Sequence, residues 1–157
     1  MAKRAKRENP HEPPPWLKRL RRHLKEKGIR VTPQRMEIYR LIHGSTEHPS
    51  AEDVFKEIKK KIPSISLDTV YRTLSLFEEI GLVKRVHLLS DHARFDPRTS
   101  QHHHFVCTEC KRIIDFSWHT LDLMPPPKEE LEGAEISMVQ AEVRGICPAC
   151  LNKRKKG

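Results

Sequence analysis

The chain of 157 residues has no apolar run that approaches the ~20 residues of a membrane-spanning helix. Its first seven residues are basic and lack the apolar stretch that a secretion signal needs. Only four cysteines are present, and hydrophobic residues make up a modest 36% of the composition. These absences predict a cytoplasmic protein with no membrane partner, in a reducing compartment where disulfides rarely persist.

The four cysteines form two Cys-x-x-Cys pairs, Cys107 with Cys110 and Cys147 with Cys150. A tight turn within each pair can direct both sulfurs to one side of the backbone, and four thiolates suit tetrahedral zinc. Two disulfides are the alternative, which a reducing compartment disfavours. The spacing therefore predicts a closed zinc site that stabilises the fold.

Histidines precede the first cysteine pair in the run His102-His103-His104. Successive side chains of an extended segment point to opposite faces, so His102 and His104 share one face and His103 lies on the other. Two imidazoles on one face can bind the same ion. We therefore expect a second, nitrogen-rich metal site with a role other than structural support, the alternative being a chance cluster of polar residues.

The net charge of +9 is concentrated in the first part of the chain. Residues 1–97 contain 21 lysines and arginines against 13 acidic residues, whereas residues 98–157 contain 9 against 8. A basic field of this kind attracts phosphate backbones, which makes nucleic acid the leading partner. An acidic protein or a membrane surface is the alternative that charge alone leaves open.

Four helices followed by a hairpin are expected in the first part of the chain. Apolar spacing and capping residues predict helices at residues 16–27, after Thr32-Pro33, after Ser50, and between Ser66 and Gly81. Two β-prone segments around a turn at residues 90–92 predict the hairpin. This order is typical of a winged helix-turn-helix, whose last helix enters the major groove. Tyr71 and Arg72 lie off its apolar stripe and become candidate DNA contacts, the alternative being a half-buried tyrosine and a solvated arginine.

The pattern changes at residue 98. Short β-prone segments at residues 105–107 and 112–116 flank the first cysteine pair, and residues 134–143 alternate as a third strand would. The prolines at 125–127 limit any helix in residues 118–131 to a short one. We predict an α+β chain with three parts: a basic, proline-rich mobile arm at residues 1–15, a winged-helix DNA-binding domain at residues 16–97, and a small α/β domain at residues 98–157.

Seven motifs carry a resemblance to a known family: GIRVTPQR at 28–35, HPSAED at 48–53, SLDTVYR at 66–72, RFD at 94–96, the histidine–cysteine block at 102–110, IDF at 114–116 and GICPAC at 145–150. Across residues 16–150 the chain resembles the ferric uptake regulator superfamily (Fur), most closely the peroxide-sensing repressors of its PerR branch. The resemblance implies a homodimeric, metal-activated transcriptional repressor that binds an inverted-repeat operator in double-stranded DNA. Residues 98–157 would then form the dimerisation and metal-binding domain.

The same resemblance implies roles for individual residues. It implies that a structural zinc ion is bound by four cysteines: Cys107, Cys110, Cys147 and Cys150. It assigns a regulatory ion, Fe(II) or Mn(II) with Zn(II) as an alternative, to His48, Asp96, His102, His104 and Asp115. It places DNA contacts at Arg30, Thr32, Arg35, Ser66, Tyr71 and Arg72.

Aspartate at positions 96 and 115 resembles the peroxide sensors, in which peroxide reacts at bound Fe(II) and oxidises a ligand histidine. Iron sensors more often carry glutamate there, and an iron-responsive or zinc-responsive repressor is the alternative within the family. Two features depart from the family pattern. The prolines at 125–127 fall where relatives carry a dimerisation helix, and the basic, proline-rich arm exceeds what relatives carry.

A zinc-dependent hydrolase is the main rival from another class, because histidines and aspartates can hold a catalytic zinc with an open position for water. No further nucleophile or general base lies near these residues in the sequence, and the basic winged helix would then have no role. We therefore expect a protein that is not an enzyme and has no small-molecule organic substrate. A zinc-stabilised nucleic-acid binder that senses nothing is the second rival.

Overall fold

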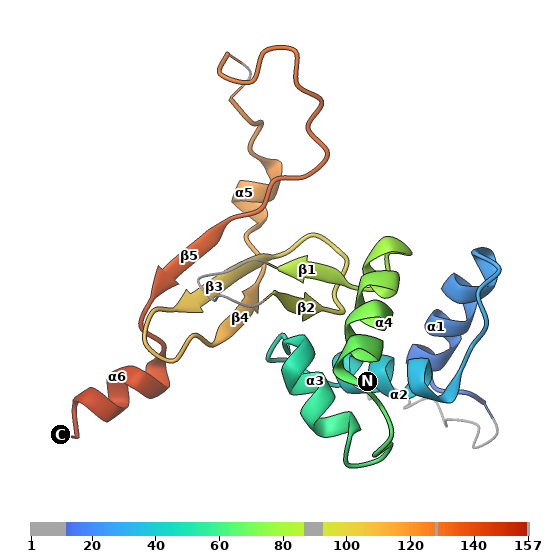
Figure 1. The fold of residues 1–157 in the computed structure, drawn as a ribbon. Coiled ribbons are helices and arrows are strands. Elements are labelled where there is room, and N and C mark those ends of the chain that lie inside the picture. The colour runs from blue at the N-terminus through green and yellow to red at the C-terminus, as the bar shows by residue number, and fades with distance from the viewer. Residues whose placement is uncertain (1–11, 87–92, 128, 157) are drawn as a thin grey trace, which may run out of the picture.

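The computed structural model describes residues 12–86, 93–127 and 129–156, and it has the predicted α+β architecture (Figure 1). Its helices are α1 (Pro15–Glu26), α2 (Pro33–His43), α3 (Ala51–Ile58), α4 (Leu67–Glu79), α5 (His119–Leu123) and α6 (Pro148–Arg154). Its strands are β1 (Lys84–Val86), β2 (Arg94–Asp96), β3 (His103–Cys107), β4 (Ile113–Phe116) and β5 (Glu142–Gly145). Within these ranges, no helix has the length and apolar character needed to cross a membrane.

Side chains at the predicted positions begin the helices of the first half. Thr32, Ser50 and Ser66 each accept a hydrogen bond from the backbone N–H three residues along, which satisfies a donor that the first turn leaves unpaired. Asp53 completes a capping box by accepting from the backbone N–H of Ser50. Gly81 follows α4 with a φ of +73°, a left-handed conformation that favours glycine. The four predicted helices therefore form close to the expected boundaries.

The apolar faces of α1 to α4 meet in one core that also includes the β1–β2 hairpin. Tyr39, Phe77 and Phe95 are its largest fully buried side chains, and the rings of Tyr39 and Phe77 meet edge to face with centroids 5.6 Å apart. Burying one such side chain stabilises the fold by roughly 1.5–3 kcal/mol. Phe95 of β2 is buried in this core, and the antiparallel hairpin pairs Lys84 with Asp96. Asp96 is therefore held next to the helices. The expected hairpin is confirmed, and its turn at residues 90–92 lies outside the described residues.

The second unit is a three-stranded sheet in the order β4-β3-β5. β3 pairs antiparallel with β4 and parallel with β5. Figure 1 shows this sheet beside the β1–β2 hairpin, with α6 extending from it on the side away from α1. Val86, Val106 and Ile113 form a small buried cluster between the hairpin and the sheet. The two units therefore meet at the hairpin.

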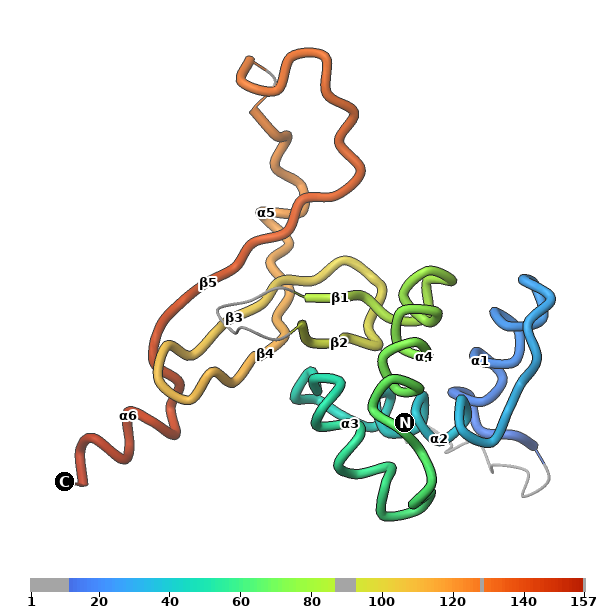
Figure 2. The backbone as a smooth tube through the Cα atoms, viewed as in Figure 1, coloured from blue at the N-terminus to red at the C-terminus, as the bar shows by residue number. Residues whose placement is uncertain are grey.

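The third strand of the sheet differs from the prediction, which placed it at residues 134–143. β5 begins at Glu142 because its parallel register pairs it only with residues 104–107 of β3. The residues before it form an irregular loop in which Ile136 and Met138 are exposed. α5 ends just before the prolines at 125–127, as expected. Figure 2 shows the loop between α5 and β5 projecting away from both units, and its last residues, 138–141, return to the sheet.

Candidate metal centres and DNA interface

The four cysteine sulfurs converge between β3 and the start of α6. The Sγ atoms of Cys107 and Cys150 are 3.9 Å apart, and those of Cys110 and Cys147 are 3.7 Å apart. Sulfurs placed tetrahedrally at about 2.3 Å from zinc are about 3.8 Å apart, whereas a disulfide holds its sulfurs at about 2.05 Å. The cluster therefore has the dimensions of a four-cysteine zinc site.

The sheet positions the two cysteine pairs. The parallel register of β3 and β5 places Cys107 opposite Gly145, where a side chain would crowd the Phe105 ring at 3.1 Å. The backbone N–H of Cys147 donates to Cys107 Sγ at 3.3 Å. That bond, with further backbone donors, outweighs burial and lowers the pKa of the Cys107 thiol to about 6. Burial and the neighbouring thiols raise the pKa of the Cys150 thiol to about 12, so of these two cysteines Cys107 more readily takes the thiolate form that zinc binds.

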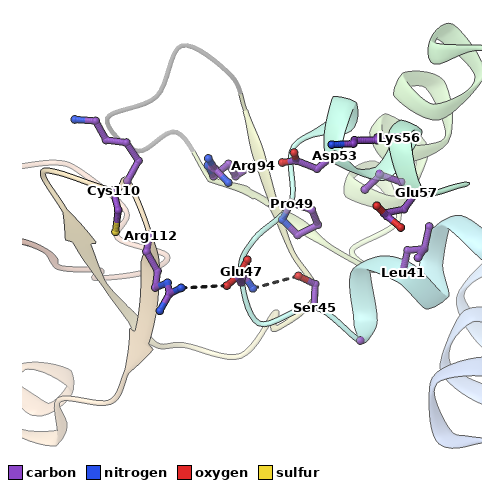
Figure 3. Close-up of a pocket in the computed structure, with 13 residues that line it drawn as sticks. Leu41, Ser45, Glu47, Pro49, Asp53, Lys56, Glu57, Arg94, Cys110 and Arg112 are labelled. Atoms are coloured by element: carbon purple, nitrogen blue, oxygen red, sulfur yellow. Dashed lines mark hydrogen bonds and ion pairs between the residues drawn. The ribbon is translucent and has the colours of Figure 1, made fainter. Parts of the chain in front are cut away.

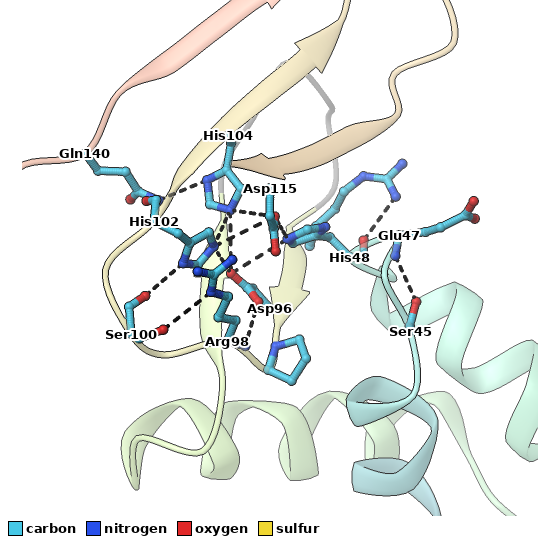
Figure 4. Close-up of polar contacts among 12 residues, drawn as sticks. Ser45, Glu47, His48, Asp96, Arg98, Ser100, His102, His104, Asp115 and Gln140 are labelled. Atoms are coloured by element: carbon cyan, nitrogen blue, oxygen red, sulfur yellow. Dashed lines mark hydrogen bonds and ion pairs between the residues drawn. The ribbon is translucent and has the colours of Figure 1, made fainter. Parts of the chain in front are cut away.

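A second cluster joins the helical unit to the sheet (Figure 4). His48 comes from the loop before α3 and Asp96 from the end of β2. His102 directly precedes β3, His104 lies within β3, and Asp115 lies in β4. One ligand atom of each residue lies within 4.8 Å of all the others. The structure thus brings together all five residues that the motifs singled out for a regulatory ion.

The separations in this cluster match those around a single ion. The shortest are 2.8 Å from His102 Nε2 to Asp96 Oδ2, 2.9 Å from His48 Nε2 to Asp115 Oδ1, and 3.0 Å between the Nε2 atoms of His102 and His104. The other nitrogen–oxygen separations run from 3.5 to 3.8 Å. Donor atoms held at about 2.1 Å from an ion are about 3.0–3.4 Å apart when adjacent. The five residues therefore need little movement to bind one ion.

Several of the ligand atoms lack other partners. Among the described residues, His48 Nε2, Asp96 Oδ2 and Asp115 Oδ1 are buried and make no hydrogen bond of acceptable angle, although they lie close together. A buried polar atom without a hydrogen bond costs about 1–3 kcal/mol. A cation among these atoms would remove that cost, so the donor set fits a metal ion.

The charge of Asp96 also suits a cation. Burial acts to raise its pKa, but contacts with His104 and His48 and the backbone N–H of Arg98 (2.7 Å) lower that pKa well below its ordinary value. The side chain is therefore a carboxylate at neutral pH although it is only 1% exposed. Mixed imidazole and carboxylate ligation is compatible with Fe(II), Mn(II) or Zn(II).

His48 is held in an uncommon backbone conformation. Its φ of +50° lies in the left-handed region, which costs energy for a residue with a side chain. Strand β2 holds it there: the Arg94 guanidinium donates to the His48 carbonyl oxygen (3.2 Å), and the Phe95 N–H donates to the Pro49 carbonyl oxygen (3.0 Å). His48 and Asp96 are thus positioned as one group within the helical unit.

Hydrogen bonds orient the two histidines of the sheet. His102 Nδ1 lies 2.8 Å from the Ser100 carbonyl oxygen, which can only accept, so Nδ1 carries the proton and Nε2 presents its lone pair to the cluster. The Gln140 side-chain amide bridges the His102 carbonyl oxygen (3.2 Å) and His104 Nδ1 (2.9 Å). An ion at His104 Nε2 requires a proton on Nδ1, so the Gln140 amide must then present its oxygen to the ring and give up its bond to the His102 carbonyl oxygen.

The variant Gln140→Leu is expected to weaken Mn(II) binding about tenfold, because losing a partner that orients a ligand typically costs ten- to a hundredfold. Competition with a fluorescent chelator measures the affinity. Gln101→Leu is the matched control, since the Gln101 amide contacts Asp122 and the Val139 carbonyl oxygen rather than the cluster. Equal Mn(II) affinities for Gln140→Leu and the unaltered protein would contradict the orienting role.

His103 lies on the opposite face of β3, as the alternation predicts. It is fully buried, its Nε2 lies 3.1 Å from Asp122 Oδ1, and its Nδ1 accepts from the backbone N–H of Ala141 (3.0 Å). Gln101 donates to the same carboxylate oxygen at 2.7 Å. These bonds tie β3 to α5 and to the segment before β5. The sequence offered no role for His103, because its partners approach only in the folded chain.

Helix α4 presents two of the expected DNA-binding side chains at the surface. Tyr71 is 40% exposed, and its hydroxyl donates to Glu52 Oε1 on α3 at 2.6 Å. Arg72 is largely exposed and pairs with Asp68 one turn earlier on the same helix (3.0 Å). An ion pair this exposed contributes little to stability and is easily exchanged for another anion. Arg72 is therefore available to a phosphate or a base edge.

The remaining candidates lie at the starts of two helices. Ser66 caps α4 and is exposed. Thr32 caps α2, and the Arg35 guanidinium donates to the Arg30 carbonyl oxygen, so these three residues are adjacent. The candidates thus form two groups, one on α4 and one at the start of α2.

A pocket separates the two units beyond the His48 loop (Figure 3). Residues of the α2–α3 loop line one side, and the turn that carries Cys110 lines the other. Glu47 and Arg112 form an ion pair of 3.6 Å across it, and both side chains are exposed. Such a pair is worth about 0–1 kcal/mol, too little to set the orientation of the two units.

Known proteins are similar to this chain in sequence and fold. The model of the ferric uptake regulator family matches residues 26–144. The chain is 38% identical over 137 residues to the peroxide operon regulator of Bacillus subtilis, which covers 87% of this chain and 94% of that protein. It superposes on the ferric uptake regulator from Francisella tularensis with iron at a TM-score of 0.66 and 28% identity, covering 79% of this chain and 96% of the other. It superposes on PerR from Streptococcus pyogenes at a TM-score of 0.51 and 31% identity, covering 86% of this chain and 92% of the other. The chain therefore belongs to the ferric uptake regulator family.

Proposed function

We propose that the protein is a metal-dependent transcriptional repressor that acts as a homodimer on an inverted-repeat operator in double-stranded DNA. The observation that carries the proposal is the origin of the five ligands. His48 and Asp96 belong to the helical unit, whereas His102, His104 and Asp115 belong to the sheet. In this proposal residues 16–97 are the DNA-binding domain, and residues 98–157 are the dimerisation and metal-binding domain.

Ligands divided in this way couple ion binding to the orientation of the two domains. All five donors reach one ion only when the domains are closed on each other, so an ion favours the closed arrangement over open ones. In a dimer the orientation sets the spacing of the two α4 helices, which must match the half-sites of the operator. Ion binding therefore raises the affinity for DNA without any contact between ion and DNA.

The four cysteines have a structural role in this proposal. Four thiolates complete a tetrahedral zinc site and leave no open position. The site joins β3 to α6 and so holds the C-terminal domain together. Exposed apolar side chains of this domain are candidates for the dimer interface, in place of a long helix: Leu123, Met124, Ile136, Met138 and Val143.

The DNA contacts are assigned to the winged-helix domain. Helix α4 enters the major groove with Tyr71 and Arg72 facing the bases or phosphates and Ser66 near the backbone. Arg30, Thr32 and Arg35 approach the backbone from the start of α2. The basic arm at residues 1–15 adds contacts that do not depend on sequence and that weaken as salt rises.

We infer that the signal is peroxide. Both carboxylates of the cluster are aspartates, and the Bacillus subtilis relative is a peroxide operon regulator. Fe(II), when bound, would supply the redox chemistry that oxidises a ligand histidine, whereas Mn(II) would not. Oxidation of His48 or His102 would remove one of the bonds that close the domains, and the repressor would release its operator.

An enzymatic role is not part of this proposal. Catalytic zinc sites usually have three protein ligands and an open position for water. Here five protein ligands converge, and His48, Asp96, His102 and His104 are buried. This arrangement suits an ion that is held rather than one that turns over a substrate.

DNA binding by the full-length, zinc-loaded protein tests the proposal, with a duplex selected from random-sequence DNA in the presence of Mn(II). We expect Mn(II) or Fe(II) to raise the affinity at least about tenfold. Hydrogen peroxide should abolish this gain with Fe(II) and leave it intact with Mn(II). Equal affinity with and without metal would contradict the metal-dependent repressor. A peroxide-resistant Fe(II) form would indicate an iron-responsive repressor, and activation by Zn(II) alone a zinc-responsive one.

A further inference from the structure

The segment that links the two units is held by one arginine of the first helix. Arg19 lies on α1, and its guanidinium donates to three oxygen atoms far along the chain. These are the carbonyl oxygens of Pro97 (3.1 Å) and Leu82 (3.3 Å) and the hydroxyl of Thr99 (2.9 Å). Pro97 and Thr99 belong to the linker that leads from β2 to β3, at residues 97–102.

This linker lies between two ligands of the candidate regulatory ion. Asp96 directly precedes it, and His102 is its last residue. The Ser100 carbonyl oxygen orients the His102 ring, and the Arg98 N–H donates to Asp96 Oδ1. The path of the linker therefore determines where the His102 nitrogen lies relative to the Asp96 carboxylate.

Packing alone leaves the linker free to move on one side. A cavity borders it there, lined by Gly81, Val83, Asp96, Thr99, His104 and Met138. Arg19 itself is held by the core, because Leu20 and Leu24 of the same helix are fully buried. Within the described residues, the hydrogen bonds that tie the linker to α1 come from one guanidinium.

The bonds of Arg19 are specific to this closed arrangement. Domain reorientation changes the backbone angles of the linker that connects the domains. A planar guanidinium presents its N–H groups in a fixed fork, so it cannot keep all three acceptors when Thr99 moves with the linker and Leu82 does not. Opening the cluster therefore breaks bonds from a charged donor.

We propose that Arg19 is a positioning residue that sets the metal concentration at which the protein responds, by holding the linker in the arrangement that the ion requires. An ion that binds only the closed arrangement has an apparent affinity reduced by the fraction of molecules that are closed. Arg19 raises that fraction before any ion arrives. The effect on DNA binding rests on the proposed function, whereas the effect on metal affinity does not.

Mn(II) titration of the full-length, zinc-loaded protein tests this role. We expect Arg19→Gln to raise the dissociation constant for Mn(II) about tenfold, because a bond from a charged donor is worth about that factor. Amide hydrogen exchange of residues 98–101 in the metal-free protein should become faster. Operator affinity at saturating Mn(II) should remain within about twofold of that of the unaltered protein, because the closed arrangement is then fully populated.

Two sets of control variants distinguish a positioning role of Arg19 from an effect of net charge and from unfolding of the Arg19→Gln variant. Arg22→Gln removes the same charge from an exposed position of α1 and should leave the Mn(II) affinity unchanged. Thr99→Val removes one acceptor with little change of volume and should weaken Mn(II) binding, and Thr99→Ser should restore it. This pair keeps the test valid if Arg19→Gln does not fold.

Unchanged Mn(II) affinity in both Arg19→Gln and Thr99→Val would overturn the inference. So would an equal loss in Arg22→Gln, because the effect would then be one of net charge. If Mn(II) has no effect on DNA binding by the unaltered protein but Arg19→Gln still weakens Mn(II) binding, the proposed function fails and the positioning role stands.

Discussion

The variant Cys110→Ser is expected to lose the structural zinc and, with it, the folded C-terminal domain. A hydroxyl does not replace a thiolate, so a closed four-sulfur site becomes a three-sulfur one. In small zinc domains the binding energy of the ion, about 10–16 kcal/mol, is folding energy. That exceeds or matches the roughly 5–15 kcal/mol by which whole domains are stable. Elemental analysis should show one zinc ion fewer per chain, and light scattering should show loss of the dimer.

Thr108→Ala is the control for this experiment. Thr108 lies in the same turn and is exposed, and within the described part of the chain its hydroxyl makes one hydrogen bond, to the Gly145 carbonyl oxygen at 3.2 Å. We expect it to retain zinc and dimer. A zinc-free Cys110→Ser protein that remains dimeric and melts at the temperature of the unaltered protein would contradict the structural role of the cysteines.

The variant Asp96→Asn is expected to keep the fold and to lose metal-activated DNA binding. Asparagine has nearly the same volume and can still accept from the Arg98 N–H, as Asp96 does at 2.7 Å. It removes the buried anionic oxygen that lies 2.8 Å from His102 Nε2. A neutral amide is a far weaker partner for a divalent cation, so we expect Mn(II) affinity to fall at least about a hundredfold. Mn(II) titration and operator binding measure the two effects.

Asp122→Asn is the matched control, because Asp122 also contacts a histidine of β3 but on the opposite face. Its carboxylate lies 3.1 Å from His103 Nε2 and outside the five-residue cluster. Asp122 orients no residue of the cluster, so Mn(II) affinity and metal-activated DNA binding should change by far less than the roughly tenfold expected when a ligand-orienting partner is lost. Full metal dependence in Asp96→Asn would show that Asp96 is not a ligand.

The sequence alone predicted most of the local structure, because local signals determine it. Thr32, Ser50 and Ser66 stand directly before apolar repeats, and each caps the helix that follows. The predicted bounds of the third strand were wrong. Alternation at residues 134–143 marks residues able to form a strand, whereas β5 forms only where β3 offers a partner. Pairing is a tertiary property that alternation does not contain.

The two metal clusters also differ in how far local sequence patterns predict them. Two Cys-x-x-Cys pairs predict their own site, because the spacing itself brings the sulfurs together. Alternation along residues 102–104 indicated His102 and His104, but the other three residues of the second cluster were identified through family motifs, since no spacing rule relates His48 to Asp115. Gln140 and Arg19 were missed altogether: their partners lie 36 and 80 residues away, and no local pattern marks either residue. The DNA contacts, the arm and the domain boundaries stay predictions.

In the proposed mechanism the two metal clusters have different roles: the four-cysteine cluster is structural and the histidine–aspartate cluster is regulatory. The cysteines all lie in the C-terminal part, so an ion there holds one domain together whatever the other domain does. The second cluster closes only when two domains meet, and the Glu47–Arg112 ion pair beside it is too exposed to close them unaided. In the proposed mechanism the orientation of the domains depends on the second cluster and the linker next to it, in addition to the small apolar contact of Val86 with Val106 and Ile113.

Calorimetric titration of Mn(II) into the zinc-loaded protein, with and without saturating operator DNA, tests the central claim most directly. If Mn(II) tightens DNA binding by closing the domains, DNA must tighten Mn(II) binding by the same factor. We predict a Mn(II) dissociation constant at least about tenfold lower with DNA, equal to the gain in DNA affinity that Mn(II) produces. The same dissociation constant in both titrations would contradict the claim that the ion controls DNA binding through the two-domain cluster.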